Sequence, residues 1–102
     1  MDISEVLQRA QAFQERMTKV QEEMGKHILS ATVGGGMVTA TVNGRHELLA
    51  VQISPEAIDP ADPEMLQDLV VAAVNEALRR SKELVQVEMD KMTGGLRIPG
   101  LF

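Results

Sequence analysis

Residues 3–24, ISEVLQRAQAFQERMTKVQEEM, decide the fold of this chain of 102 residues. Good helix formers fill most of the stretch, and neither Gly nor Pro interrupts it. Its apolar side chains recur at alternating intervals of three and four residues, at Ile3, Val6, Ala10, Phe13, Met17, Val20 and Met24. We call these seven residues the seam, because this interval is the a/d repeat of a coiled-coil helix. The sequence therefore predicts a long helix over residues 3–26 with a narrow apolar seam that needs a partner.

Past Gly25 the hydrophobic pattern changes from the helical period to the alternation of β-strands. Strands are expected over residues 28–33, 37–42 and 45–53, with the three glycines at 34–36 as the first connection. The dipeptide Asn43-Gly44 predicts a two-residue type I′ turn as the second connection, because both residue types tolerate a positive φ. Residues 28–53 thus form a three-stranded antiparallel meander.

A second helix is predicted over residues 62–93, with Asp62 as its N-cap and Pro63 as its first residue. A wide apolar stripe over residues 65–78 suits it to cover the sheet, and the sparser apolar residues 84–92 are expected to cover the seam of the first helix. Gly94-Gly95 ends this helix, and an apolar tail completes the segment 94–102. The chain is one domain, residues 1–102, of the α+β class with the order α-β-β-β-α.

Composition narrows the function classes. The chain has no Cys, Trp or Tyr, which excludes disulfides and thiolate metal sites and disfavours stacking on single-stranded bases. No apolar run approaches the ~20 residues of a membrane span, and the amino terminus does not resemble a signal peptide. We therefore expect a cytoplasmic protein with no membrane partner.

The net charge of −5 argues against a nucleic-acid partner when taken over the whole chain. However, residues 56–68 carry five acids and no base, so the 10 basic residues face 10 acids in the rest of the chain. We call residues 56–68 the acidic segment. Because one segment holds the whole excess, the global charge is a poor guide to any single face.

No catalytic constellation stands out. His27 and His46 have no carboxylate or second His at a metal-ligand or general-base spacing. The glycines at 34–36 lack the Lys-Ser/Thr and the helix of a phosphate loop, and no Ser lies in a nucleophile elbow. The sequence predicts that the protein is not an enzyme and has no metal, cofactor or small-molecule substrate.

The basic residues form two groups. Four on the first helix share one flank of the seam, and four gather on the distal part of the second: Arg9, Arg16, Lys19 and Lys26, then Arg79, Arg80, Lys82 and Lys91. One interpretation is a solvated surface, since Glu76–Arg80 and Arg79–Glu83 are i,i+4 pairs that stabilise an isolated helix slightly. The other is a binding surface, and periodicity alone leaves both open.

Several motifs, in this order, resemble the YbaB/EbfC family of nucleoid-associated DNA-binding proteins. They span nearly the whole chain: Met17, Gln21 and Met24, Asn43-Gly44, Val51-x-Ile53 with Pro55, the run MLQDLVVAAVNEA at 65–77, Met92-Thr93-Gly94-Gly95 and Pro99-Gly100-Leu101-Phe102. Each motif is common alone, but their order and spacing are specific.

The resemblance implies an α-β-β-β-α protomer in a tweezer-like homodimer joined through its sheet region. It further implies a location in the nucleoid, helical arms that bind double-stranded DNA with little sequence preference, and a possible effect on chromosome organisation and gene expression. By position, the eight basic residues named above become the candidate DNA contacts. The alternative is a coiled-coil-type protein interaction module without direct DNA binding, in which the seam recruits a partner helix.

Overall fold

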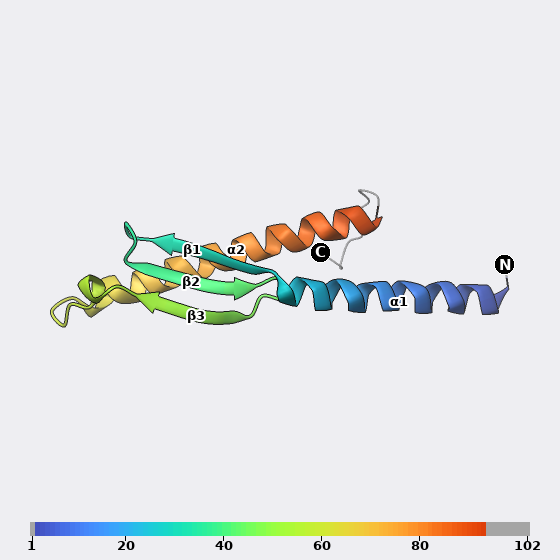
Figure 1. The fold of residues 1–102 in the computed structure, drawn as a ribbon, viewed down its shortest axis with the longest axis horizontal. Coiled ribbons are helices and arrows are strands. Elements are labelled where there is room, and N and C mark those ends of the chain that lie inside the picture. Colours follow the sequence, from blue (N-terminus) through green and yellow to red (C-terminus); the bar gives the residue numbers. More distant parts are fainter. Residues whose placement is uncertain (1, 94–102) are drawn as a thin grey trace.

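The computed structural model describes residues 2–93 (Figure 1). The elements follow in the order α1 (Ile3–Lys26), β1 (Ile28–Val33), β2 (Val38–Asn43), β3 (Leu48–Ile53), the short 3-10 helix η1 (Pro55–Ala57) and α2 (Pro63–Thr93). The predicted order α-β-β-β-α is thus confirmed. The expected stop at Gly94-Gly95 and the tail lie outside the described residues.

The three strands form one antiparallel sheet in the order β1-β2-β3, and α2 covers one of its faces (Figure 1). Alternate residues of β1 and β2 point at α2, so Ala31 lies opposite Ala40 on the covered face. Small side chains on both layers bring the helix close to the sheet. The buried core consists of Ala31, Val38, Ala40, Val42, Ala73 and Ala77.

The second face of the sheet carries the hydroxyl side chains of β1 and β2 and has no helix over it in the single chain (Figure 1). Its hydroxyl groups pair across the strands, with Ser30 Oγ 3.2 Å from Thr41 Oγ1 and Thr32 Oγ1 2.9 Å from Thr39 Oγ1. These cross-strand pairs stabilise the register of β1 against β2. The meander therefore has one buried apolar face and one uncovered face on which these hydroxyl groups pair.

The predicted type I′ turn at Asn43-Gly44 is wrong. Residues 44–46 form a three-residue loop, in which the positive φ of 64° belongs to His46 and the Asn43 N–H donates to the Glu47 carbonyl at 3.1 Å. Three-residue hairpin loops of this kind combine a type I turn with one left-handed residue. Gly44 serves another purpose, because a Cβ there would lie 2.5 Å from the carbonyl oxygen of Met24. The glycine admits a close approach to α1, and β3 begins at Leu48, later than expected.

The other connections follow the prediction. All three glycines of the loop between β1 and β2 have positive φ, between 65° and 96°. At the start of α2, Asp62 Oδ1 accepts a hydrogen bond from the Met65 N–H at 3.3 Å, as an N-cap does. The α1 helix ends one residue past Gly25, with His27 as its C-cap.

The prediction that the distal turns of α2 cover the seam is wrong for most of its length. The helices lean apart beyond the sheet (Figure 1), and Ile3 and Phe13 are 76% and 42% exposed. Only Met24, at the carboxyl end of the seam, is buried. One residue separates α1 from β1, and α1 extends beyond the end of the sheet, whereas α2 lies along its face (Figure 1). The protein is accordingly elongated, 69 × 22 × 17 Å.

Candidate functional site

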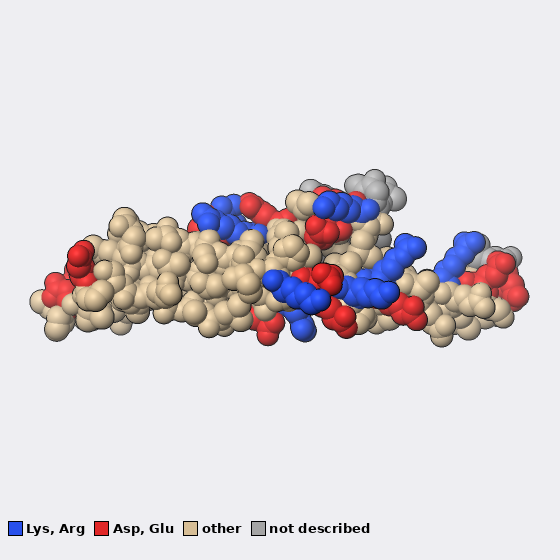
Figure 2. Space-filling model, in the orientation of Figure 1, with Lys and Arg blue, Asp and Glu red and all other residues tan. Residues whose placement is uncertain are grey.

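The candidate site lies on two helical arms, which are α1 and residues 79–93 of α2. On the face drawn in Figure 2, Lys and Arg side chains gather over these arms, and much of the sheet end is free of them. The acidic segment lies at the opposite end of the long axis, where the chain passes from β3 to α2 (Figure 1). The fold therefore separates the excess negative charge from the basic residues.

All four predicted cations of α1 are exposed on the first arm. Lys26 pairs with Glu23, with its Nζ 3.3 Å from the carboxylate. Within residues 2–93, Arg9, Arg16 and Lys19 form no ion pair. These three side chains keep their full charge available to an external anion, and they follow one flank of the helix.

Most of the candidate cations of α2 form ion pairs with carboxylates of the same helix. Arg79 donates hydrogen bonds to Glu76 and Glu83, and Arg80 Nε lies 3.5 Å from Glu76. The hydrogen bond from Arg79 lowers the pKa of Glu76 below its ordinary value of 4.5, and the same pair raises the pKa of Arg79. Both i,i+4 pairs that the solvated interpretation predicts are present in this cluster.

Two further cations of α2 differ from each other. Lys91 pairs with Glu88 at 3.1 Å, whereas Lys82 forms no ion pair within the described part of the chain. Arg80 has a second role, because its guanidinium donates to the carbonyl oxygen of Ser30 at 2.6 Å. Since β1 is an edge strand, this bond ties the edge of the sheet to α2.

Sequence reasoning missed Arg45, which it placed in the third strand. The structure places it in the loop between β2 and β3, beside the end of α1, where its Cδ lies 3.0 Å from the position of a Cβ on Gly25. Residues 2–93 offer its guanidinium no carboxylate partner. The only sequence signal was a single base at the tip of the hairpin. Only the tertiary structure brings Arg45 close to α1.

The same loop is fastened to α2 through a buried Ser81. Its hydroxyl donates to the Asn43 carbonyl at 2.8 Å and lies 2.7 Å from His46 Nδ1. Because the serine proton is already donated, Nδ1 carries the imidazole proton and donates to Ser81. On its other side the Gly44 N–H donates to the Met24 carbonyl at 2.9 Å. This loop therefore connects both arms to the sheet.

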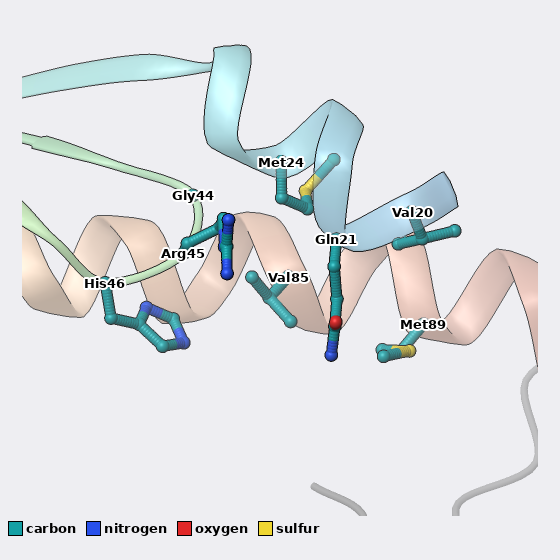
Figure 3. A pocket seen from close by; sticks show the side chains of 8 residues that line it. All are labelled: Val20, Gln21, Met24, Gly44, Arg45, His46, Val85 and Met89. Atoms are coloured by element: carbon teal, nitrogen blue, oxygen red, sulfur yellow. The ribbon is translucent and has the colours of Figure 1, made fainter. Parts of the chain in front are cut away.

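A cavity of about 190 Å³ opens where the two arms and the loop meet (Figure 3). We call it the fork cavity. Its walls combine apolar side chains with three hydrogen-bonding side chains: Val20, Gln21, Met24, Gly44, Arg45, His46, Val85 and Met89. The polar groups of Gln21, Arg45 and His46 come from two elements, α1 and the hairpin loop.

Other kinds of site are not evident in residues 2–93. No group of three His, Asp or Glu side chains there is placed to hold a metal ion. None of the helices in the described part combines the length and the apolar character needed to cross a membrane. The exposed cations of the arms and the fork cavity are therefore the features to be explained.

Comparison with known proteins identifies relatives over nearly the whole chain. The model of the YbaB/EbfC DNA-binding family matches residues 1–96. A nucleoid-associated protein of Pelotomaculum thermopropionicum is 46% identical over 99% of this chain and 96% of its own length. Another, from Thermoanaerobacter sp., is 52% identical over 99% of this chain and 91% of its length.

Among solved structures, the uncharacterized protein HP0035 from Helicobacter pylori has the same fold. It superposes with a TM-score of 0.82 at 25% sequence identity, covering 91% of this chain and 98% of that one.

Proposed function

This chain belongs to the YbaB/EbfC DNA-binding family, and from that premise we propose that it is a nucleoid-associated protein that binds duplex DNA as a homodimer. The contacts are mainly to phosphates and come from the exposed cations of the arms. Such binding places the protein in the nucleoid, within the bacterial cytoplasm, where it affects chromosome organisation. The family is described by DNA binding and not by an enzymatic activity.

One observation carries the proposal: some of the candidate cations form ion pairs within the chain, and others do not. The structure leaves Arg9, Arg16, Lys19 and Lys82 without ion pairs among the described residues, and all four lie on the arms. The other four candidate contacts each form an ion pair with a neighbouring carboxylate. Phosphate contacts carry no sequence information, so little sequence preference is expected.

The test compares two double neutralisations that change the charge equally. Arg16→Gln with Lys19→Gln removes free cations, and Arg79→Gln with Lys91→Gln removes paired ones. For the wild type, log K should fall linearly with log[salt] by about 0.9 per phosphate contact, so the first variant lowers this slope by about 1.8 per chain. The second variant should change it far less.

Titrating two unrelated duplexes by fluorescence anisotropy measures both the slope and the sequence preference. The proposal fails if the wild type binds neither duplex at low salt. If the two variants lose the same amount of DNA affinity, the choice of Arg16 and Lys19 as contacts is wrong.

Two uncovered surfaces support the homodimer. The seam is exposed in the single chain over most of its length, with Val6 at 46% exposure, and the hydroxyl face of the sheet has no covering layer. An apolar seam of this length is typical of an interface between chains. Sedimentation velocity should give twice the chain mass of 11.1 kDa, and a monomer at tens of micromolar concentration would contradict the proposal.

The exposed seam also favours the second candidate, an interaction module that recruits another protein through a helix. The net charge of −5 agrees with this candidate. Pull-down from lysate with and without nuclease separates the two: partners that persist after nuclease treatment are bound by protein contacts, and partners that disappear were bridged by DNA.

A further inference from the structure

The strand β1 forms one edge of the sheet, and its outer side pairs with no other strand within residues 2–93 (Figure 1). Its six residues, ILSATV, are all uncharged, and none is Gly or Pro. Edge strands of this composition are templates for pairing with another chain, and proteins limit such pairing with charges, bulges or a covering element. The other edge, β3, has an extra residue, Leu49, opposite Thr41 and Val42, whereas the pairing of β1 is regular. A bulge therefore interrupts the ladder of β3, and β1 has no such interruption.

The backbone hydrogen bonds show which residues of β1 face outward. The register of β1 against β2 places His27 opposite Gly44, and the Gly44 N–H donates to the His27 carbonyl at 3.1 Å. In an antiparallel ladder, every second residue bonds to the neighbouring strand. Residues 29, 31 and 33 thus bond to β2, and Ile28, Ser30 and Thr32 direct their backbone N–H and carbonyl groups outward.

The side chain of Arg80 occupies the central outward carbonyl of β1. Its Nη1 donates to the Ser30 carbonyl oxygen at 2.6 Å. The Nε of the same guanidinium lies 3.5 Å from Glu76, one turn earlier in α2, so the side chain is held at both the helix and the strand. A strand added to this edge would place one of its own N–H groups where the guanidinium lies. It therefore cannot bond to Ser30 while Arg80 remains there.

We propose that Arg80 blocks the addition of a second copy of β1 to this edge, and thereby limits the self-association of the protein. A second copy is the partner that fits, because β1 is self-complementary about Ser30. When two β1 strands lie antiparallel with their Ser30 residues opposite each other, Ile28 of each lies opposite Thr32 of the other, so all three outward residues are paired. A shift by two residues leaves one outward residue of each strand without a partner in β1. The Ser30 carbonyl is thus at the centre of the pairing that Arg80 prevents.

The neighbouring Arg79 makes no such contact. It donates to Glu76 and Glu83 of its own helix, and among the described residues it has no hydrogen bond to the sheet. Charge at this turn of α2 can therefore be changed without freeing the edge of β1. The inference concerns contacts between copies of the chain, so it does not depend on DNA binding.

The first test compares Arg80→Ala with Arg79→Ala, because each removes one positive charge and an ion pair with Glu76. Sedimentation velocity of the full chain is recorded over a wide range of chain concentration. Arg80→Ala should associate beyond the wild-type species, with an association constant about tenfold higher, which corresponds to about 1.4 kcal/mol for one hydrogen bond. Arg79→Ala should sediment as the wild type. Equal association of the two variants overturns the inference.

Disulfide cross-linking tests the register. Since the chain has no Cys, Ser30→Cys introduces a single thiol at the centre of the pairing. Opposite residues of a hydrogen-bonded antiparallel pair have Cα atoms about 5.5 Å apart, which a disulfide can bridge. Under mild oxidation, this chain should cross-link about tenfold faster with Arg80→Ala than with Arg80 in place.

Thr32→Cys is the matched control in the same strand. In the proposed register its two copies lie four residues apart along the paired strands, about 13 Å, which is too far for a disulfide. Equal cross-linking of the Ser30→Cys chains with and without Arg80 contradicts the inference, and so does faster cross-linking through Thr32→Cys.

A double variant separates strand addition from unfolding. Arg80→Ala with Thr32→Lys places a charged side chain on the edge strand, which opposes pairing with another strand. Association should then return to the wild-type level, whereas association caused by unfolding would persist. If the lysine does not reduce the association of Arg80→Ala, the free edge is not its cause and the inference fails.

Discussion

Replacing Gly44 by Ala should loosen the attachment of α1 to the rest of the protein. The added Cβ would lie 2.5 Å from the carbonyl oxygen of Met24 and 3.0 Å from its Cβ, and the first of these contacts is with backbone. Either the loop or the end of α1 has to move. The Gly44 N–H then loses its hydrogen bonds to the carbonyls of Met24 and His27, which are 2.9 and 3.1 Å long.

The expected cost follows from three contributions. Overpacking of a closely fitted site costs about 1–3 kcal/mol, and the lost hydrogen bonds cost about 1 kcal/mol more. The lower entropy of the unfolded chain offsets about 0.4–1 kcal/mol, because alanine is less flexible than glycine. The sum is a loss of about 1–3.5 kcal/mol in the free energy of unfolding, a large part of the 5–15 kcal/mol typical of a domain.

The matched control is Gly25→Ala, the same substitution on the facing element. Its Cβ meets only the side chain of Arg45, at 3.0 Å, and the glycine lies within α1. Alanine favours a helix over glycine by about 0.5–1 kcal/mol, which should balance a small displacement of the arginine stem. We expect Gly25→Ala to be within about 1 kcal/mol of the wild type.

Urea unfolding followed by far-UV circular dichroism is the suitable assay, since the chain has no Trp or Tyr to report by fluorescence. With a slope of about 1–2 kcal/mol per molar urea, Gly44→Ala should lower the midpoint by about 0.5–3.5 M. All proteins are compared at one chain concentration, because dimerisation would add to the apparent stability. The packing argument is refuted if Gly44→Ala and Gly25→Ala have the same midpoint.

Three other outcomes are expected. Ser81→Ala should cost about 0.5–1.5 kcal/mol in thermal or urea unfolding, because it removes the serine hydrogen bond to the buried Asn43 carbonyl, which still accepts from the His46 N–H; a wild-type midpoint would contradict the role assigned to that hydroxyl. Because the pKa of Glu76 is lowered, the stability from its pair with Arg79 is complete above pH 4.5 and is lost as the pH falls through the lowered pKa. Glu76→Gln should therefore flatten the acid side of the profile of stability against pH. Parallel profiles for the variant and the wild type would argue against this role of the pair. Asp62→Ala should destabilise α2 by about 1 kcal/mol through loss of its N-cap, with Asp62→Asn restoring most of it; equal midpoints for the two would discount the cap.

The candidate site was only partly predictable. The pairing of Arg79 with Glu83 follows from their spacing of four residues on one helix, and the structure confirms it. The bond from Arg80 to the Ser30 carbonyl joins residues 50 positions apart, so no local pattern indicates it. Arg45 was missed for the same reason, since Gly25, beside which its side chain lies, belongs to another element.

The sequence by itself determined the order of elements and which face of each element is apolar, because hydrophobic period is a local property of the chain. The repeat in residues 3–24, the alternation within 28–53 and the apolar stripe over 65–78 are enough for this. Only the tertiary structure decided that most of the seam stays exposed in the single chain, since the direction of α1 depends on how Met24 packs against Gly44. Helix propensity specifies that α1 forms, whereas contacts between distant segments specify where it points and which cations remain free.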